Sequence, residues 1–122
     1  MKLHHVGMTV NSLRRSNEFY QRYFGFKEEM EFQWGSEKIL FLKKEDCRLE
    51  LIEESGKDSV SKGVFLHLAL EVDDLETEIG LLMKEGLSPV EGPLVLENGW
   101  KVAFFYGPDG EIIEMVEEDH SR

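Results

Sequence analysis

The stretch HLALEVDDLETEIGLLMKEGL, residues 67–87, contains the patterns of one strand and one helix in succession. From Leu68 to Val72 every second residue is apolar, which is the period of a strand with one face on a core. Asp73 or Asp74 then supplies a helix N-cap, and a glycine suited to the left-handed C′ position closes the segment. Helical spacing predicts that the helix buries Leu75, Ile79, Leu82 and Met83.

The same arrangement occurs in HVGMTVNSLRRSNEFYQRYFGF, residues 5–26, where His5 corresponds to His67 when the two stretches are aligned. Asn11 or Ser12 supplies the N-cap of this first helix. Strand-like runs separated by turn signals follow each helix. In the first half they cover residues 26–34, 38–44 and 47–53; in the second half they are weak over 87–97 and strong over 100–106 and 111–117.

These patterns predict two βαβββ units in tandem, an α+β fold in which residues 1–122 form a single domain. The units cover about residues 3–53 and 64–117, and the polar segment 54–63, rich in Gly, Ser and Lys, joins them. A sheet that carries its helix on one face leaves its other face free. Two such free faces turned toward each other would form a cup.

The composition is typical of a soluble globular protein, with 122 residues, 41% hydrophobic and 32% charged. No apolar run approaches the length of a membrane span, and MKLHHVGMTV lacks the apolar region of a signal peptide. The net charge of −11, from 14 basic and 25 acidic residues, disfavours a nucleic-acid partner. Cys47 is the only cysteine, which fits a reducing compartment. We therefore expect a cytoplasmic protein that binds neither nucleic acid nor membrane.

Four polar residues fall on the predicted free faces. His5 and His67 each open a unit, and Glu50 and Glu114 lie in the last strand of each unit. The spacing is 45 residues from His5 to Glu50 and 47 residues from His67 to Glu114. A single histidine in a strand is more often a hydrogen-bonded structural residue than a ligand. Chance placement of four polar residues at matching repeat positions is much less common.

Two neutral imidazoles and two carboxylates make a donor set for one divalent metal ion per site. Nitrogen and oxygen donors suit zinc, nickel, manganese, cobalt or iron(II), and no thiolate is present in the set to select otherwise. Glu114 is flanked by Ile112 and Val116, and a carboxylate in apolar surroundings is costly unless a cation compensates it. Zinc and nickel are the metals we expect first.

The motifs HVGMTV, SNEFYQRYFGF, HLALEVDD and AFFYGPDGEIIEMVE occur in this order across about residues 3–117. In this order and spacing, the chain resembles the vicinal oxygen chelate superfamily, which includes glyoxalase I, bleomycin-resistance proteins and extradiol dioxygenases. The resemblance implies the tandem βαβββ fold and a ligand set similar to the His, Glu, His, Glu set of bacterial glyoxalase I. On this interpretation His67 is the third metal ligand.

The resemblance also implies a function, that of a glyoxalase-type lyase or isomerase acting on a small enolisable carbonyl compound. In such a reaction a bound metal acts as Lewis acid and stabilises an enediolate, while a carboxylate moves the proton. The resemblance favours Glu114 as the base, with Glu50 as a second base for the opposite face. It further implies a homodimer, in which His5 and Glu50 of one subunit meet His67 and Glu114 of the partner subunit. A site built within one chain stays open as the alternative.

The positions that bind glutathione in bacterial glyoxalase I differ here. Those proteins carry an Arg four residues after the first ligand and an Asn four residues after the first Glu, whereas this chain has Thr9 and Glu54. We therefore expect a small-molecule substrate other than the standard glutathione adduct. Arg48 shares the predicted face of Glu50, where it could bind an anionic substrate or form a salt bridge.

The strand-like run 100–106 supplies further pocket residues by resemblance. Trp100, Val102 and Phe104 are expected to line the cup, together with Thr9. Because the run is apolar on both faces, core packing is a fair alternative for these side chains. His4 is expected to point toward the helix side of its strand.

Other functions of the superfamily remain as alternatives. A metal-free drug-binding or resistance protein would suit the acidic charge, because such drugs are basic, but members of that kind typically lack the four metal residues. An extradiol dioxygenase needs only two His and one Glu. Gly7 stands where a fosfomycin-modifying enzyme has Thr, and Glu50 stands where a CoA-thioester epimerase usually has Gln.

Overall fold

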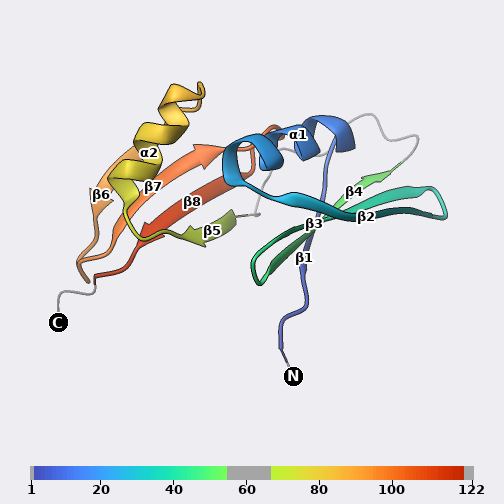
Figure 1. Ribbon diagram of the computed structural model, residues 1–122, viewed down its shortest axis with the longest axis horizontal. Helices are drawn as coiled ribbons and strands as arrows, with labels where there is room; N and C mark the ends of the chain where they lie inside the picture. Colours follow the sequence, from blue (N-terminus) through green and yellow to red (C-terminus); the bar gives the residue numbers. More distant parts are fainter. Residues whose placement is uncertain (1, 55–66, 120–122) are drawn as a thin grey trace. The chain divides into compact units, whose positions relative to one another are not determined.

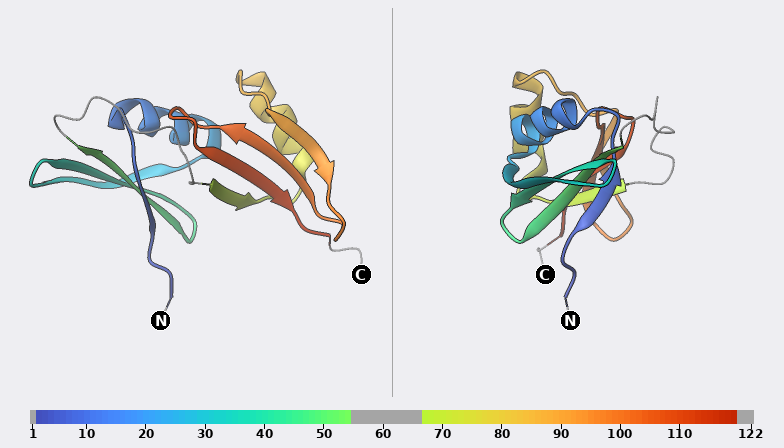
Figure 2. Two further views of the ribbon diagram at one scale, coloured as in Figure 1. Left: turned by 180° about the vertical axis from the view of Figure 1, so that it is seen from behind. Right: turned by 90° about the vertical axis from the view of Figure 1, so that its right-hand side faces the viewer.

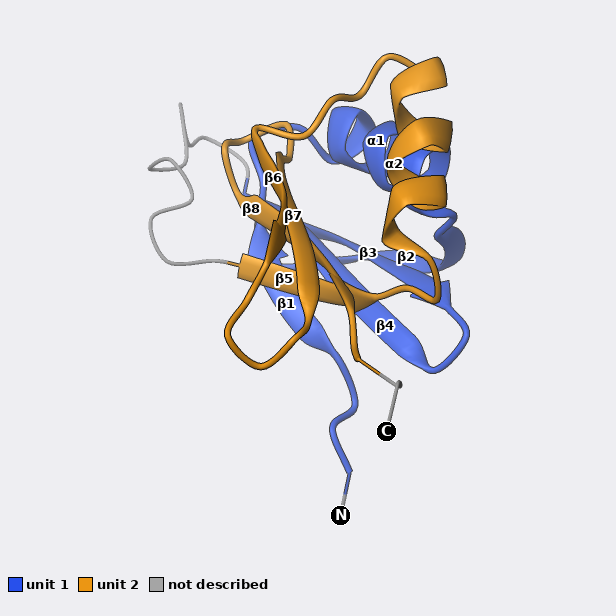
Figure 3. Ribbon diagram, turned by 90° about the vertical axis from the view of Figure 1, so that its left-hand side faces the viewer, with its two compact units in different colours: residues 1–62 blue, residues 63–122 orange. Residues whose placement is uncertain are grey.

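The computed structural model describes residues 2–54 and 67–119. The chain divides into two compact units, residues 1–62 (unit 1) and 63–122 (unit 2), which are coloured separately in Figure 3. The boundary falls within the predicted joint, residues 54–63, and all of that joint except Glu54 lies outside the described residues.

Unit 1 is a four-stranded sheet with one helix on one face (Figure 1). The strand order is β1-β4-β3-β2, in which β1 runs parallel to β4 and the other neighbours are antiparallel. The elements are β1 (Val6–Thr9), α1 (Leu13–Phe24), β2 (Lys27–Trp34), β3 (Glu37–Lys44) and β4 (Cys47–Glu54).

Unit 2 repeats this topology with the strand order β5-β8-β7-β6. Here β5 runs parallel to β8, and the other neighbours are antiparallel. The elements are β5 (His67–Glu71), α2 (Leu75–Lys84), β6 (Glu91–Val95), β7 (Lys101–Tyr106) and β8 (Ile112–Glu117). The predicted α+β fold with two tandem βαβββ units is therefore confirmed.

Each helix packs on the sheet of its own unit, as the views in Figure 2 show. The side chains between helix and sheet are almost fully buried, and they alternate along the central strands with side chains that point to the other face. In unit 1 they include Tyr20, Leu40, Leu42, Leu49 and Leu51; in unit 2 they include Leu75, Leu82, Phe105, Ile113 and Met115.

Both helices begin at side-chain caps. Ser12 accepts a hydrogen bond from the backbone N–H of Arg15, and Asp74 accepts one from the backbone N–H of Thr77. The expectation for Met83 is wrong, because its side chain is 54% exposed. The buried residues of α2 lie at positions 75, 79 and 82, and Met83 falls on the flank of that narrow stripe.

A second contact at each helix start was not apparent from the sequence. Glu53 Oε1 accepts a hydrogen bond of 2.7 Å from Leu13 N, and Glu117 Oε1 accepts one of 2.8 Å from Leu75 N. Each carboxylate therefore binds one of the free N–H groups at a helix N-terminus, where negative charge is favourable. Both glutamates follow a candidate ligand by three residues, so the last strand of each unit is tied to its helix.

Within residues 2–54 and 67–119, no helix combines the length and the apolar character needed to cross a bilayer.

Candidate metal centre

In unit 1 the candidate pair lies where β1 meets β4. The two strands run parallel, with Gly7 opposite Glu50, and His5 directly precedes β1. His5 Nε2 lies 3.3 Å from Glu50 Oε1, and the two side chains are 33% and 17% exposed. Parallel pairing of the first and last strands thus brings together a histidine and a carboxylate that are distant in sequence.

In unit 2 the same topology brings His67 and Glu114 together. Ala69 lies opposite Glu114 on the parallel strands β5 and β8. His67 Nε2 lies 2.5 Å from Glu114 Oε1, and the side chains are 51% and 15% exposed. Each unit therefore brings one His and one Glu side by side, and their assignment as metal ligands stays a prediction.

Gly7 provides the space that the Glu50 carboxylate occupies. A Cβ atom at residue 7 would lie 2.7 Å from Glu50 Oε1, which is closer than side-chain carbons approach a carboxylate. The backbone of Gly7 does not have a positive φ, so the conformation itself does not require glycine. A side chain at residue 7 would therefore require the carboxylate, the flexible end of Glu50, to shift. This role of Gly7 is visible only from the strand register, which pairs it with Glu50 and which the sequence alone does not show.

Glu50 shares its face of the sheet with apolar and aromatic side chains. Phe41 lies directly opposite Glu50 on β3, and its ring meets the His5 ring edge-on at a centroid distance of 5.0 Å. Phe32 stacks on Phe41 at 6.2 Å, with 22° between the ring planes. Thr9 lies on the same face, opposite Ile52. Large exposed side chains continue this face along β2: Met30 (49%), Phe32 (44%) and Trp34 (73%).

In unit 2 the strand register decides which side of β7 faces the candidate ligand. Phe104 lies opposite Glu114, and Val102 lies opposite Val116, so both side chains point to the face of Glu114. Val102 is buried, whereas Trp100 precedes β7 and is 36% exposed. The register therefore puts Val102 and Phe104 on the face of Glu114, and their place in a substrate pocket stays a prediction.

Arg48 is engaged by an acidic neighbour from β2. Its Nε and Nη2 atoms each donate to a carboxylate oxygen of Glu29 at 2.7 Å, and both side chains are 22% exposed. This hydrogen-bonded pairing lowers the pKa of the Glu29 carboxyl below its usual value. A β-bulge between Glu28 and Met30 turns the Glu29 side chain toward Arg48. Of the two roles considered for Arg48, the salt bridge is present.

His4 does not point toward the helix side as expected. Its Nε2 lies 3.2 Å from Arg48 Nη1, and its Nδ1 lies 2.8 Å from His5 Nδ1. Both neighbours belong to the face of Glu50. The expectation used strand alternation, but β1 begins only at Val6, so alternation does not control the residues before it.

The donors present fit a divalent cation. Each unit offers one imidazole nitrogen and one carboxylate oxygen at close distance, the ligand types that zinc and nickel accept. Across residues 2–54 and 67–119, no three His, Cys, Asp or Glu side chains converge as a complete metal site. Within each unit the described donors therefore come as a pair.

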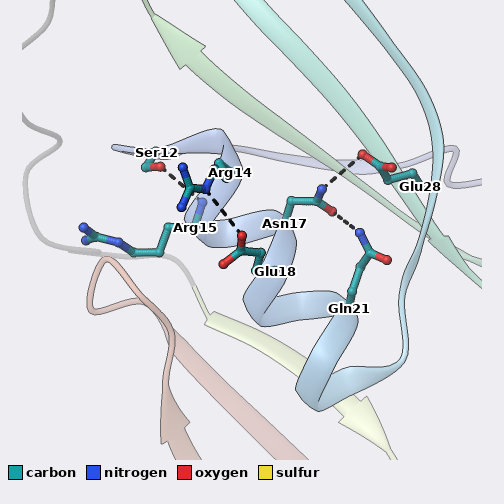
Figure 4. A network of polar contacts seen from close by, with 7 residues as sticks. All are labelled: Ser12, Arg14, Arg15, Asn17, Glu18, Gln21 and Glu28. Atoms are coloured by element: carbon teal, nitrogen blue, oxygen red, sulfur yellow. Dashed lines mark hydrogen bonds and ion pairs between the residues drawn. The ribbon is translucent and has the colours of Figure 1, made fainter.

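The opposite face of the unit 1 sheet carries a different feature. A pocket of about 280 Å³ opens between α1 and the strands β2 and β3. Beside it, Asn17 donates to Glu28 Oε1 at 3.1 Å and accepts from Gln21 at 2.6 Å (Figure 4). The pocket is lined by Leu13, Arg14, Asn17, Glu28, Glu31, Lys38, Leu40 and Glu53. It is separate from the His5–Glu50 pair, because Leu40 and Glu53 point to the helix face.

The chain belongs to the Glyoxalase/Bleomycin resistance protein/Dioxygenase superfamily, whose family profile matches residues 2–115. The resemblance inferred from the motifs is thereby confirmed.

Related proteins and solved structures match nearly the whole chain. The uncharacterized protein YwbC of Bacillus subtilis is 28% identical over 122 residues, which are 95% of this chain and 97% of that protein. The lactoylglutathione lyase of Escherichia coli O157:H7 is 28% identical over 131 residues, 97% of this chain and 93% of that protein. The crystal structure of a glyoxalase family protein from Enterococcus faecalis superposes with a TM-score of 0.83 at 26% identity, covering 95% of this chain and 97% of that chain.

Proposed function

We propose that the chain is a metal-dependent lyase or isomerase of the glyoxalase type, acting on a small enolisable carbonyl compound. The proposal is supported by one observation above all. In each unit a histidine Nε2 lies beside a glutamate Oε1, at 3.3 Å in unit 1 and 2.5 Å in unit 2. Membership of the superfamily and the likeness to a lactoylglutathione lyase agree with this class of reaction.

The four side chains His5, Glu50, His67 and Glu114 would hold one divalent ion, zinc or nickel by preference and manganese, cobalt or iron(II) as alternatives. Such an ion, when bound, supplies Lewis acidity that lowers the pKa of the substrate carbon acid. Glu114 then removes and returns the proton at that carbon as general base, and Glu50 takes the equivalent role on the opposite face. Both carboxylates are mostly covered, which limits competition from water.

The surroundings of the pairs favour an apolar substrate over the glutathione adduct. Phe32 in unit 1 and Phe104 in unit 2 present apolar surface on the faces of the carboxylates, and the buried Phe41 and Val102 lie on the same faces. Trp100 and Thr9 are assigned to the same pocket. Arg48 is held by Glu29, so its charge is already compensated. We expect the glutathione hemithioacetal to be a poor substrate for these reasons.

A second candidate is a small-molecule binding protein that works without metal. The exposed side chains of Met30, Phe32 and Trp34 on one strand favour it, because contiguous exposed apolar surface commonly marks a binding face. The two candidates differ in what they require of the four donors: the binding protein would keep its ligand when the donors are removed.

Metal titration tests the proposal directly. Zinc and nickel are titrated into the chain and into the double variant Glu50→Ala, Glu114→Ala, with calorimetry as the readout. We expect about one ion per pair of units in the chain and a loss of tight binding in the variant. Equal binding by both proteins would show that the four residues are not the ligands and would favour the metal-free binding protein.

We further propose that the protein works in the cytoplasm as a homodimer that shares its sites. His5 and Glu50 of one subunit would meet His67 and Glu114 of the partner subunit. The free thiol of Cys47 agrees with a reducing compartment.

Mixing two damaged proteins tests the shared site. His5→Ala and His67→Ala variants are unfolded and refolded together, and zinc binding is measured in the mixture. A shared site gives one intact site and one doubly damaged site per mixed dimer, so tight binding returns. Mixed dimers without recovery would mean that each chain builds its own site.

A further inference from the structure

A continuous series of polar contacts leads from Glu29 to Glu50 through three basic side chains. Arg48 binds both oxygens of Glu29 at 2.7 Å and places Nη1 3.2 Å from His4 Nε2. His4 Nδ1 lies 2.8 Å from His5 Nδ1, and His5 Nε2 lies 3.3 Å from Glu50 Oε1. Each member of the series therefore touches the next, and the last contact is the candidate ligand pair of unit 1.

The direction of these hydrogen bonds follows from the chemistry of arginine. A guanidinium group donates and cannot accept, so His4 Nε2 must accept from Arg48. A neutral His4 then carries its proton on Nδ1 and donates it to His5 Nδ1. With Nδ1 accepting, a neutral His5 carries its proton on Nε2, which faces the carboxylate of Glu50. All donors and acceptors are matched in this direction and in no other.

This tautomer opposes metal binding by His5. A ring nitrogen that ligates a metal must be free of its proton, and in most sites the other ring nitrogen donates to a carboxylate, carbonyl or water. If His5 ligates through Nε2, its proton moves to Nδ1, and the contact with His4 is kept only if His4 accepts that proton. The proton of His4 then lies on Nε2, where it meets the N–H of Arg48. Ligation by His5 through Nε2 therefore breaks either the contact of His4 with Arg48 or the contact of His4 with His5.

We propose that Arg48, acting through His4, is a positioning residue that holds His5 in the tautomer unable to ligate through Nε2, so that a cation binds to unit 1 only when His4 loses its contact with Arg48 or with His5. This inference rests on the proposed function in one respect, the assignment of His5 as a ligand. It gives Arg48 and His4 a role in adjusting metal affinity without direct contact with the ion.

Unit 2 lacks the equivalent of this series among its described residues. Ile112 occupies the position of Arg48, two residues before the carboxylate, and it lies opposite His67 on the sheet. The described polar contact of His67 is with Glu114 alone, while the residue preceding it lies outside residues 67–119. The two pairs therefore differ in their supporting contacts although they share one topology.

The tautomer is read from ring nitrogen chemical shifts of ¹⁵N-histidine-labelled protein without metal. His5 is assigned by comparison with His5→Gln. We expect His4 to carry its proton on Nδ1 and His5 to carry its proton on Nε2. In Arg48→Met, His4 loses this preference. A proton on Nδ1 of His5 in the unsubstituted protein would overturn the inference without any reference to metal or activity.

Zinc affinity is the second readout. The direction in which it changes on substitution distinguishes a positioning role from a structural one. His4→Phe keeps an aromatic ring beside His5 and leaves the net charge unchanged for neutral His4. Loss of a supporting contact usually weakens metal binding about 10- to 100-fold. Here we expect His4→Phe to strengthen zinc binding about tenfold, the lower end of what one hydrogen bond to a charged group contributes.

Charge needs its own control, because removal of Arg48 also removes a positive charge near the site. The double variant Glu29→Gln, Arg48→Met keeps the net charge, and it should strengthen zinc binding like His4→Phe. Ile112→Met puts methionine at the matching position of unit 2 and should leave affinity within about twofold of the starting value. Unchanged or weaker zinc binding in His4→Phe would overturn the inference and leave the assignment of the four metal ligands intact. Absence of zinc binding in the unsubstituted chain would instead overturn the proposed function, and this inference with it.

Discussion

In unit 1 the histidine precedes its strand, whereas in unit 2 the histidine is the first residue of β5. Gly7 lies opposite the carboxylate in unit 1, and Ala69 lies opposite it in unit 2. Unit 1 also has Arg48 and His4 beside its pair, and Ile112 takes the place of Arg48 in unit 2. One topology therefore repeats the two donors but not their surroundings, so the two pairs can differ in affinity and in proton transfer.

The largest difference between the units should appear in turnover. Glu114→Gln removes the proposed general base, and we expect the rate with an enolisable carbonyl substrate to fall about 100- to 10,000-fold. Glu50→Gln is the matched change in unit 1 and should cost less. Steady-state rates at saturating metal make the comparison, with zinc affinity measured in parallel. A larger loss for Glu50→Gln would exchange the roles of the two carboxylates.

Substitution of the residue opposite each carboxylate should have the next largest effect, on zinc affinity. In Gly7→Ala the new Cβ would lie 2.7 Å from Glu50 Oε1, so the carboxylate must move away from His5. We expect zinc affinity to fall about tenfold or more, as when a contact that orients a ligand is lost. Ala69→Gly is the matched control in unit 2, and it should leave affinity nearly unchanged because it adds no atom beside Glu114.

Thermal unfolding of the metal-free protein separates this effect from a folding defect. The backbone of Gly7 accepts alanine because its φ is not positive. In addition, glycine in a strand is unfavourable by about 0.5–1 kcal/mol relative to alanine. Gly7→Ala should therefore unfold at the same temperature or higher. A lower unfolding temperature together with unchanged zinc affinity would contradict the proposed role of Gly7.

The smallest expected effect concerns the two helix caps and pH. The backbone N–H of Thr77 donates to Asp74 and lowers the pKa of its carboxyl, whereas the Ser12 cap of α1 does not titrate. A lowered folded-state pKa means that the stabilisation is present above the unfolded-state pKa, about 4, and is lost as the pH falls through the lower folded-state value. The carboxylates Glu53 and Glu117 also accept from the starts of α1 and α2, one on each helix, so acid should weaken both starts and that of α2 more.

Hydrogen exchange of the backbone amides in the first turn of each helix measures this difference between pH 5 and pH 3. Asp74→Ser makes the two caps alike and should remove the excess pH dependence of α2. An equal response of both helices in the unsubstituted protein would mean that the Asp74 cap adds no acid sensitivity of its own.

The repeat was readable from sequence because it depends on periodicity within single elements. Alternating apolar residues, Ser or Asp at helix starts and the matched spacing of His5 to Glu50 and His67 to Glu114 indicate two βαβββ units and two donor pairs. The sequence also contains a signal for the carboxylates Glu53 and Glu117, because each follows a candidate ligand by three residues. Their contact with a helix N–H could not, since it depends on how the helix packs on the sheet.

By itself the sequence determined the fold, the two pairs and the face on which Glu50 and Glu114 lie, because strand period and repeat spacing are local properties. Tertiary structure decided the surroundings of the pairs. Strand register put Phe41 and Gly7 beside Glu50, and a bulge turned Glu29 onto Arg48. The prediction for His4 was wrong because this residue lies before β1, where no strand alternation directs the side chain. Register, bulges and chain ends are set by contacts between elements, which periodicity within an element does not encode.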